Sequence, residues 1–384
     1  MNLSEVKPMK AAIIGCGSIS DIFFKNFTER FKIIDLVCCA SKGMKSAHNK
    51  AAQYGIKACT VEEIMVNPEI ELVINVTPAE AHFDIIKSAL EAGKHVWTEK
   101  EISDTSEHSK ELYDLAREKG LWLGSEPDHF LGASWQTARE QIDAGIIGDV
   151  TSAFVSVSEN MNGVADKLRF INEPAGGIGF DFGIYSVTQL VALFGPAKSV
   201  SGVMKTMNPT RRHCDVHNPQ FGEEYTYINE DFVAGNITFE SGVVATLHFN
   251  GNSIMEAPSS FMIYGSMGVL SMPRGAEFSG EITMFRMGNF EPTKVLPVYP
   301  FDHDSRGVGA AEMAWAIRTG REPRASAQLG IHCQEILEGM KISGETGRVY
   351  EMKSTCNVPK PLPKGYRGAI PLFSYDEEGA LVLE

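Results

Sequence analysis

A lysine at the end of an apolar stretch is the first residue whose position suggests chemistry. In HVWTEKEISD (95–104), Val96 and Trp97 read as part of a buried strand, and Glu99, Lys100 and Glu101 follow directly. Charged side chains are rarely buried without a partner, so this is either a solvated strand end or a lysine directed at a ligand. Ligands of open parallel sheets bind beyond the carboxyl ends of the strands. Lys100 is therefore a candidate for contact with a reacting group.

A glycine turn lies near the start of the chain. In AAIIGCGSISD (11–21), Gly15 and Gly17 stand between a predicted strand and a predicted helix. Gly15 permits a tight turn, and Gly17 lets the backbone approach a pyrophosphate at the helix N-terminus. Ser20, a small residue, replaces the third glycine of the G-x-G-x-x-G pattern. This context predicts a dinucleotide site, and its candidate contacts here are Gly15, Gly17, Ser18 and Ile19.

The residue that would read the adenosine ribose is less plainly marked. A spacing of about 20 residues points to Asp35, which lies near the start of the second predicted strand. The carboxyl end of that strand reads CCASKG (38–43) and places Ser41 and Lys42 at the ribose. This stretch has no carboxylate that would repel a 2′-phosphate, and the Lys42 ammonium can pair with such a phosphate. NADP is at least as plausible as NAD, although Lys42 can equally be a solvated lysine.

A helical pattern in the second half carries a second set of polar residues. In GFDFGIYSVTQ (179–189), Asp181, Tyr185, Thr188 and Gln189 fall on one helix face, and Phe182 and Leu190 are expected on the buried side. Tyrosine on an amphipathic helix can also be ordinary packing. The residues alone therefore leave both interpretations open.

Other polar residues were weighed as ligand contacts. RRHCDVHNP (211–219) contains possible metal ligands, but consecutive residues converge poorly on one ion, so no metal is predicted. His129 in EPDHF (126–130) is either a cleft residue or a structural histidine. The segment around Asn160, Asn162, Asp166 and Arg169 is suited to bind a polyol. We take His129, Asn160 and Arg169 as substrate candidates.

The first part of the chain must position the lysine and the glycine turn. Residues 9–124 alternate apolar strand candidates with helical patterns such as 79–93. Near-continuous apolar strands separated by helices predict a parallel sheet covered on both faces. The strand candidates are 10–15, 33–40, 71–76, 95–98 and 121–124. We predict one domain over 1–130.

The remainder, 131–384, is predicted to form a second domain. Period-two alternation over 149–159 and 231–299 indicates a mixed or antiparallel sheet. In GVVATLHFN (242–250), Val243, Ala245, Leu247 and Phe249 share one face, and FESGV (239–243) predicts a hairpin turn. Helices are expected at about 179–194, 304–319 and 327–342. The proline-rich stretch 357–373 is expected to form an extended arm on the surface or on a partner subunit.

Composition excludes some classes of function. The 384 residues are too many for one ordinary core, and the net charge of −14 comes without a basic block. Nucleic acid and anionic membranes are therefore unsuitable partners. No apolar run approaches the roughly 20 residues of a membrane helix. Seven cysteines without framework spacing predict a reducing cytoplasm and no disulfides.

Together these motifs resemble the glucose–fructose oxidoreductase, inositol dehydrogenase and rhizopine-catabolism (Gfo/Idh/MocA) family of NAD(P)-dependent oxidoreductases. The resemblance covers nearly the whole chain. It includes the glycine turn and the stretches VINVTPAEAHFDIIKSALEAGKHVWTEK (73–100), GGIGFDFGIYSVTQLVALFG (176–195) and AEMAWAIRTGREPRAS (311–326). It implies an α/β fold, with an N-terminal Rossmann domain and a C-terminal α/β domain for substrate binding and oligomerisation. That domain's large, mainly antiparallel open sheet would pack against another subunit, which implies a homo-oligomer.

The resemblance also implies site residues. Glu99 and Lys100 match the family's Glu-Lys-Pro motif, in which the lysine touches the reacting hydroxyl beside the nicotinamide, and Glu101 replaces the proline. Asp181 and Tyr185 match an aspartate and a histidine or tyrosine that lie beside the substrate. Further cofactor contacts expected along the second stretch are Thr77, Pro78, His82 and Glu99.

The implied function is hydride transfer between a nicotinamide and a secondary alcohol or ketone of a sugar, glycoside or cyclitol. Tyr185 would be the acid–base, Lys100 would lower its pKa, and Asp181 would orient the pair. Two alternatives stay open: reduction of a small dicarbonyl or aldose, and a non-catalytic dinucleotide-binding regulator.

Overall fold

The structure is a computed structural model that describes residues 6–254 and 259–363, apart from the side chains of Arg169 and Phe290. The chain divides into two compact units. One combines residues 1–133, 298–330 and 359–384, and the other combines 134–297 and 331–358. Each unit thus joins separate stretches of the chain, whereas the sequence assigned one continuous stretch to each domain. Part of the proline-rich arm, 364–373, lies outside the described residues.

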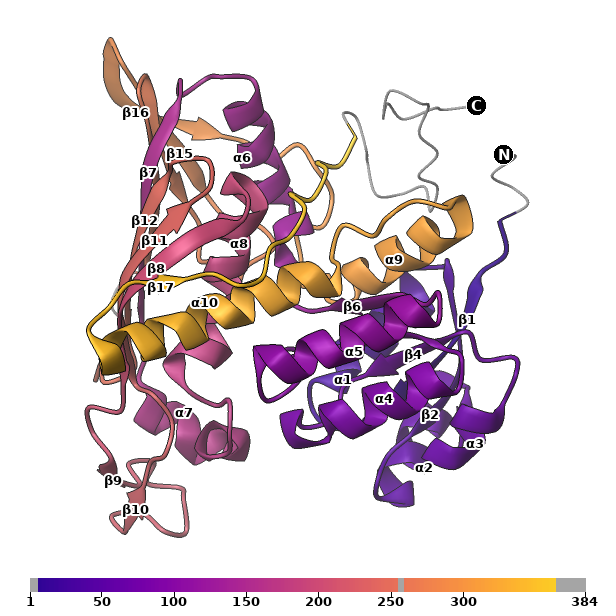
Figure 1. Cartoon of the computed structure of the whole chain (residues 1–384). Coiled ribbons are helices and arrows are strands. Elements are labelled where there is room, and N and C mark those ends of the chain that lie inside the picture. Colours follow the sequence, from indigo (N-terminus) through magenta and orange to yellow (C-terminus); the bar gives the residue numbers. More distant parts are fainter. Residues whose placement is uncertain (1–5, 255–258, 364–384) are drawn as a thin grey trace. The chain divides into compact units, whose positions relative to one another are not determined.

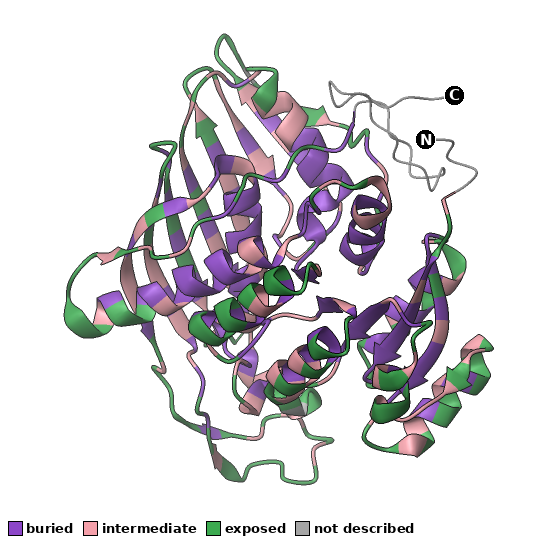
Figure 2. Cartoon of the chain, turned by 45° about the vertical axis from the view of Figure 1, so that its right-hand side comes forward, coloured by how far each residue is buried: buried purple, intermediate pink, exposed green. Residues whose placement is uncertain are grey.

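The first unit contains a parallel sheet that is buried on both faces (Figure 1). Within the described residues it has six strands in the order β3-β2-β1-β4-β5-β6. This is the strand order of a doubly wound dinucleotide-binding fold. Figure 2 shows the central strands coloured as buried, as expected for near-continuous apolar strands. The strands are β1 (Met9–Ile14), β2 (Ile34–Ala40), β3 (Lys57–Ala58), β4 (Leu72–Asn75), β5 (His95–Thr98) and β6 (Leu123–Ser125).

Two helices of the first unit, α3 and α5, begin at local capping residues. Thr60 and Glu63 form a reciprocal capping box at the start of α3, and Thr105 Oγ1 accepts a hydrogen bond from His108 N–H at the start of α5. Such caps satisfy backbone N–H groups that have no partner within the helix. The helices are α1 (Ser20–Glu29), α2 (Met44–Tyr54), α3 (Val61–Val66), α4 (His82–Glu91), α5 (Ser106–Glu118) and α9 (Val308–Thr319).

Helix α9 belongs to the first unit although it lies far along the chain. Asp128, in the loop after β6, accepts hydrogen bonds from the backbone N–H groups of Gly307 and Gly309 at 3.0 and 2.8 Å. A carboxylate at a helix N-terminus satisfies unpaired donors and interacts favourably with the helix dipole. This long-range cap fixes the start of α9 to the end of the parallel sheet.

The second unit contains a larger sheet. Within the described residues it has nine strands in the order β16-β15-β14-β13-β7-β12-β11-β8-β17, antiparallel except for the parallel pair β12–β7. The predicted α/β fold class, with a mainly antiparallel second sheet, is confirmed. The strands are β7 (Val150–Ser158), β8 (Ala197–Lys205), β11 (Phe232–Phe239), β12 (Val244–Asn250), β13 (Ser260–Gly265), β14 (Gly268–Met272), β15 (Ile282–Arg286), β16 (Asn289–Val295) and β17 (Tyr350–Glu351), and β9 (Thr210–Arg212) pairs with β10 (Glu224–Thr226).

The two faces of this sheet differ, as the alternation predicted. Ala245, Leu247 and Phe249 are buried, and the side chains between them on β12 are exposed. The buried face packs on helices: the rings of Trp135 and Phe261 lie 4.9 Å apart, and those of Phe194 and Phe239 lie 5.6 Å apart. Figure 1 shows these helices on one side of the sheet. They are α6 (Ala133–Asp143), α8 (Ile184–Phe194) and α10 (Ala327–Thr346), and the short α7 (Met161–Lys167) follows β7.

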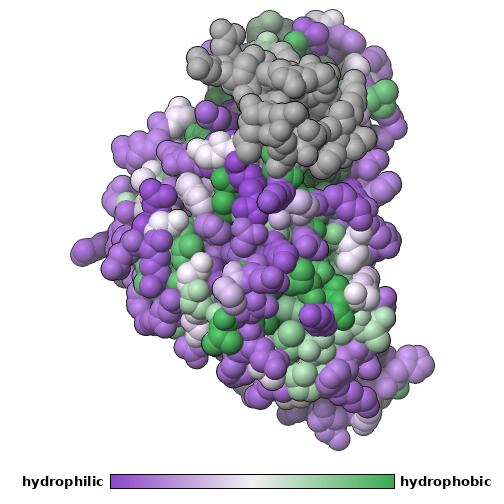
Figure 3. Space-filling view, turned by 90° about the vertical axis from the view of Figure 1, so that its right-hand side faces the viewer, coloured by the Kyte–Doolittle hydropathy of each residue, from purple (hydrophilic) through white to green (hydrophobic). Residues whose placement is uncertain are grey.

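The helices that the structure describes can be compared with the length and apolarity of a membrane-spanning helix. Across the described residues, none of the helices is both long and apolar enough to span a bilayer. On the face drawn in Figure 3, hydrophilic side chains predominate and hydrophobic ones form smaller patches between them.

Candidate functional site

The glycine turn after β1 has the geometry of a phosphate-binding turn. Gly15 has a φ of +114°, and a Cβ at this position would overlap the backbone carbonyl of Val76. Its N–H donates to the carbonyl oxygen of Ala40 at 2.9 Å, which ties the turn to the end of β2. A Cβ on Gly17 would meet nothing within 4 Å, so the space in front of the turn is open. The turn therefore fits a pyrophosphate at the N-terminus of α1.

Ser20 occupies the position of the third glycine, and its side chain is small enough to stay buried there. The residue is fully buried, and its Oγ donates to the carbonyl oxygen of Gly17 at 2.6 Å. The serine thus fastens the turn to the first residue of α1. Ser18 and Ile19 lie between them at the open side, with Ile19 exposed.

The other cofactor candidates of the first unit follow the ends of neighbouring parallel strands. Parallel strands end at one edge of a sheet, so the residues after β1, β2, β4 and β5 share that edge. Asn75, at the end of β4, connects two of them: its Nδ2 donates to Thr98 Oγ1 at 3.0 Å, and its Oδ1 accepts from Thr77 Oγ1 at 2.7 Å. Sequence reasoning missed Asn75, although an asparagine ending an apolar strand was a usable signal.

His82, the first residue of α4, holds two of these loops together. It is buried, with Nδ1 2.6 Å from the carbonyl oxygen of Glu101 and Nε2 2.9 Å from that of Thr77. Burial lowers the pKa of the ring. A neutral imidazole donates one hydrogen bond, so the ring bonds to one of the two carbonyl oxygens and packs against the other. Pro78 precedes the 3-10 turn Ala79–Ala81 that leads into α4.

Lys100 follows β5 at the same edge. Its side chain is half-buried, and its backbone N–H donates to Glu99 Oε2 at 3.2 Å. Glu101, which stands where the family has proline, is buried, and the peptide bond between Lys100 and Glu101 is cis. The lysine thus stands at a strand end beside a carboxylate.

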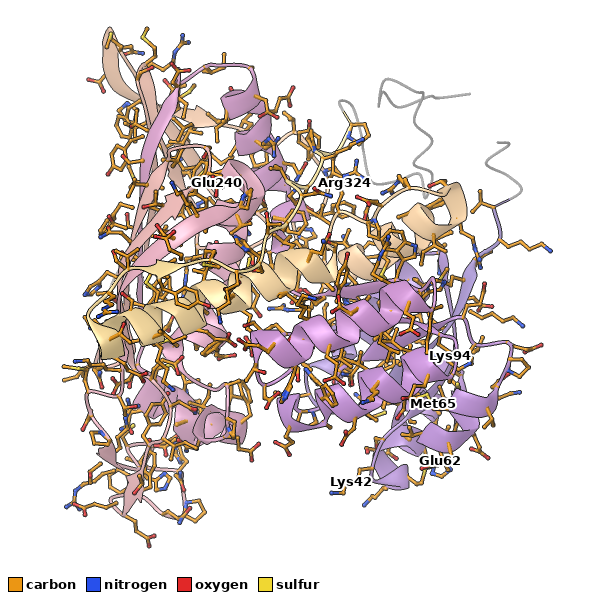
Figure 4. The ribbon with its side chains drawn as sticks, viewed as in Figure 1. Lys42, Glu62, Met65, Lys94, Glu240 and Arg324 are labelled. Carbon is orange, nitrogen blue, oxygen red and sulfur yellow. The ribbon has the colours of Figure 1, made fainter. Side chains whose placement is uncertain are left out.

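The ribose-side candidates follow β2. Ser41 is half-buried, and its Oγ donates to the carbonyl oxygen of Gly43 at 2.7 Å. Lys42 is exposed, and Figure 4 shows its side chain pointing away from the ribbon. Asp35, the second residue of β2, lies at the opposite end of that strand.

Asp181 and Tyr185 lie in the second unit at the junction of two helical turns. Asp181 belongs to a π-helical turn, Ile178–Gly183, and Tyr185 is the second residue of α8. Both are half-buried. The expected polar face beyond them was wrong, because Thr188 and Gln189 are buried and donate to the carbonyl oxygens of Ile184 and Gly275. Phe182, expected to be buried, is only half-buried, since the π turn breaks the 3.6-residue period.

Glu230, just before β11, supports the turn that carries Asp181. Its Oε1 accepts hydrogen bonds from the N–H groups of Gly179 and Phe180 at 3.0 and 3.2 Å, and its carbonyl oxygen accepts from Ile178. A Cβ on Gly177 would overlap the Glu230 carboxylate. Desolvation raises the pKa of Glu230 to about 7, against the opposing effect of these N–H groups. No local pattern marks Glu230 in the sequence.

We expect Glu230 to make the stability of the protein depend on pH. Its carboxyl group has a pKa of about 7 in the folded protein, above the ordinary value of a glutamate, so the folded state favours the protonated form. The free energy of unfolding should therefore fall as pH rises from about 5 to about 7. Glu230→Gln should remove roughly 2 kcal/mol of this fall, measured by urea denaturation at pH 5 and pH 8. The exposed Glu240 (Figure 4) provides the control variant Glu240→Gln. Equal pH slopes for wild type and Glu230→Gln would contradict the assignment.

Two substrate candidates of the second unit lie around α7. Asn160 caps this helix, because its Oδ1 accepts the N–H of Gly163 at 3.0 Å. Arg169 lies in the 3-10 turn Arg169–Asn172. Nearby, Asp166 accepts the N–H groups of Cys214 and Asp215 and the side-chain amide of Asn218. Asp166 therefore organises the 213–218 loop, which gives this histidine- and cysteine-containing stretch a structural explanation.

His129 is in the first unit, in the 3-10 turn His129–Leu131, and is 1% exposed. Glu126 and Asp128 are buried beside it, and these three are the residues in the described part of the chain whose ligand atoms could hold a cation. Burial raises the pKa of the Glu126 carboxyl well above its usual range and lowers that of His129. A bound cation would explain why the Glu126 and Asp128 carboxyl groups lie side by side. A single proton shared by the two groups explains it equally well. A role of His129 in substrate binding stays a prediction.

Two family profiles match consecutive parts of the chain. The profile of the oxidoreductase family with an NAD-binding Rossmann fold matches residues 9–126, and that of the GFO/IDH/MocA C-terminal domain matches residues 135–271. The first profile covers β1 to β6, and the second covers β7 to β13 of the nine-stranded sheet.

Individual relatives are distant. The D-glucoside 3-dehydrogenase of Escherichia coli (strain K12) is 29% identical over 252 residues, which cover 62% of this chain and 69% of the relative. The scyllo-inositol 2-dehydrogenase (NADP(+)) of Bacillus subtilis (strain 168) is 24% identical, covering 90% and 96%. Two uncharacterized oxidoreductases of Schizosaccharomyces pombe are 28% and 32% identical, and the chain spans about half the length of each, 55%.

A solved structure supports the fold. Levoglucosan dehydrogenase in complex with NADH and L-sorbose superimposes with a TM-score of 0.77 at 19% identity, covering 90% of this chain and 99% of the other. Both profiles match in sequence order, and the parallel sheet of the first unit agrees with the Rossmann fold that the first profile names. The chain therefore belongs to the Gfo/Idh/MocA oxidoreductase family, with its NAD-binding Rossmann fold followed by its C-terminal domain.

Proposed function

We propose that the protein is an NAD(P)-dependent oxidoreductase that transfers a hydride between the nicotinamide and a secondary alcohol or ketone of a sugar, glycoside or cyclitol. The observation that carries this proposal is in the first unit. A glycine turn with open space at Gly17 and a half-buried lysine, Lys100, follow strands of one parallel sheet at the same edge. Relatives named for a glucoside and an inositol support the substrate class.

The residues of the chain would bind the cofactor and move a proton. The bound nicotinamide supplies or accepts the hydride. Gly17 and the first turn of α1 would hold the pyrophosphate through backbone N–H groups, and Gly15 would give the turn its shape. Lys100 would donate to the substrate oxygen, and Tyr185 would exchange the hydroxyl proton, with Asp181 orienting that exchange.

A turnover screen tests this function. The purified full-length chain is incubated with NAD or NADP and a panel of sugars, glycosides and cyclitols, and the absorbance of reduced nicotinamide is followed. Turnover with a member of the panel supports the proposal. Tight dinucleotide binding without turnover on alcohols, ketones, dicarbonyls or aldoses would instead favour the non-catalytic regulator.

Lys42→Ala should weaken NADP binding more than NAD binding. Lys42 is exposed after β2, where an ammonium group can pair with a 2′-phosphate that NAD lacks. We expect a loss of about tenfold in NADP affinity, consistent with one charge-assisted hydrogen bond. Calorimetric titration of both cofactors measures it, and Lys45→Ala, an exposed lysine of α2, is the matched control. A preference for NAD that is unchanged by Lys42→Ala would refute the role of this lysine.

We propose that the protein is a homo-oligomer formed through the exposed face of the nine-stranded sheet. This face carries large apolar side chains on three adjacent strands: Phe154 is 37% exposed, Val244 38% and Tyr264 36%. Adjacent apolar side chains on an exposed face commonly mark subunit contacts. Light scattering at micromolar concentration should show more than one chain per particle, and Val244→Lys should reduce that number. A monomeric wild type would overturn this proposal.

A further inference from the structure

The chemistry proposed above makes no use of a buried cluster of three ionisable side chains. Glu126, Asp128 and His129 follow β6 and are 3%, 0% and 1% exposed. The N–H of Glu126 donates to the carbonyl oxygen of Thr98 at 2.9 Å, so the cluster begins beside the end of β5. Charged side chains are almost never fully buried unless they are paired. A buried set of this kind needs a partner of matching charge.

Backbone N–H groups hold one oxygen of each carboxylate in the cluster. Asp128 Oδ2 accepts from Gly307 and Gly309 at 3.0 and 2.8 Å. Glu126 Oε2 accepts from Asp128 N–H at 2.9 Å. The other two oxygens, Glu126 Oε1 and Asp128 Oδ1, are buried, and no hydrogen-bond donor among the described residues reaches them. Carboxylates that bind a metal through one oxygen are commonly held by hydrogen bonds in this way.

An imidazole completes the cluster. His129 Nδ1 lies 3.6 Å from Asp128 Oδ1, and one ligand atom from each of the three residues lies within 4.8 Å of the others. Burial lowers the pKa of the ring, so the imidazole is neutral, which is the form that binds metals. A proton shared by the two carboxyl groups explains their contact, but it does not explain why an imidazole nitrogen lies this close to both. A cation bound by all three residues explains the whole cluster.

We propose that Glu126, Asp128 and His129 bind a divalent transition-metal ion, for which Zn²⁺ serves as the probe. Zn²⁺ accepts imidazole nitrogen together with carboxylate oxygen, whereas Mg²⁺ and Ca²⁺ prefer oxygen ligands alone. Zn²⁺ binds such atoms at about 2.0–2.2 Å, so small side-chain rotations must bring the three ligand atoms closer together. This site is separate from the 211–219 stretch, for which no metal is predicted. His129 would then be a metal ligand and not a substrate contact.

The ion would compensate the buried charge of the two carboxylates. Among the charged neighbours of Asp128, Arg306 acts on it with a positive charge and Glu99 with a negative one, so these two oppose each other. A divalent cation matches two ionised carboxylates, whose burial without a partner is costly.

The position of the cluster gives the ion a structural role. Asp128 also caps α9, so the ion would fasten the loop after β6 to the start of that helix within the first unit. All three ligand residues are buried, so the ion would stabilise the fold and would not bind a substrate. The proposal is therefore independent of the dinucleotide, the substrate and turnover.

Metal analysis and thermal unfolding of the untagged full-length chain test the proposal. Because the ligands are buried, Zn²⁺ is supplied during expression as well as to the purified chain, which is then dialysed to remove weakly bound ions. We expect one Zn²⁺ per chain to survive dialysis. The melting temperature should rise with the Zn²⁺ concentration and fall after chelation, because the ion binds the folded state. Calorimetric titration of the chelated chain with Zn²⁺ gives the dissociation constant.

Glu126→Gln and His129→Gln should each weaken Zn²⁺ binding by about 100-fold or more. The loss of a group that only supports a metal ligand already costs roughly 10–100-fold, and these variants remove a ligand itself. Glutamine keeps the length of Glu126 and can still accept the Asp128 N–H, so Glu126→Gln should fold without metal. His108→Gln is the matched control, because His108 forms an exposed imidazole–carboxylate pair with Asp104 at 2.7 Å. The control should bind Zn²⁺ like the wild type.

X-ray absorption at the zinc edge identifies the ligands in the wild type, so the test does not depend on whether the variants fold. We expect nitrogen and oxygen ligands without sulfur. Sulfur ligands would place the ion at a cysteine and overturn the proposal. A wild type that retains no Zn²⁺ after dialysis, or Zn²⁺ binding that is unchanged in both Glu126→Gln and His129→Gln, would also overturn it. A proton shared by Glu126 and Asp128 would then explain their contact.

Discussion

Lys100→Met is expected to abolish turnover and to leave dinucleotide affinity nearly unchanged. Methionine keeps the length of the side chain but cannot donate to an oxygen that gains charge during hydride transfer. Removal of such a donor typically lowers turnover by about 10²–10³-fold. The dinucleotide should still bind, because in our proposal the glycine turn after β1, and not Lys100, holds the pyrophosphate through its backbone. The rate with a substrate found in the screen and the NADPH dissociation constant measure the two effects.

Two companion variants separate this role from a general effect of removing charge. Lys110→Met removes an exposed lysine of α5 and should retain the wild-type rate. Tyr185→Phe should lower turnover with a smaller change in KM, because it removes a proton-transfer group and keeps the ring. A wild-type rate for Lys100→Met would show that the reacting oxygen is stabilised by another group.

Gly17→Val is expected to remove dinucleotide binding from a protein that remains folded. A Cβ at Gly17 meets nothing within 4 Å, so the free chain has room for the side chain. The same space is where we place the pyrophosphate, so the valine would occupy it. We expect an affinity loss of about 100-fold or more, equivalent to losing two charge-assisted hydrogen bonds. Calorimetric titration gives the affinity, and circular dichroism with thermal unfolding shows whether the fold is kept.

Gly15→Ala is the matched comparison for Gly17→Val, because it should destabilise the folded protein instead of blocking the dinucleotide. Gly15 adopts a φ of +114°, and a Cβ there would overlap the carbonyl of Val76, the residue after β4. The free energy of unfolding should fall by roughly 2 kcal/mol or more. Wild-type affinity in Gly17→Val, together with a normal melting temperature, would show that the pyrophosphate does not lie over this turn.

The elements that carry the cofactor site are recognisable from the amino-acid sequence. The strands of the parallel sheet are buried on both faces, so they appear as apolar runs, and helices separate them. The glycine turn was recognisable because the backbone conformation at Gly15 and the open space at Gly17 require glycine within a stretch of three residues. Alternation in β12 predicted its buried face, since successive side chains of a strand point to opposite sides.

Only the tertiary structure decided which residues support that site. Asp128 caps α9 across about 180 residues of sequence, and Glu230 holds the turn of Asp181. None of these contacts has a local pattern, because each joins segments that become neighbours only when the strands and helices pack. The π turn before Tyr185 likewise replaced the expected regular helix. The Gly179 and Phe180 N–H groups of this turn donate to Glu230. Hydrophobic periodicity cannot reveal such a hydrogen-bond partner.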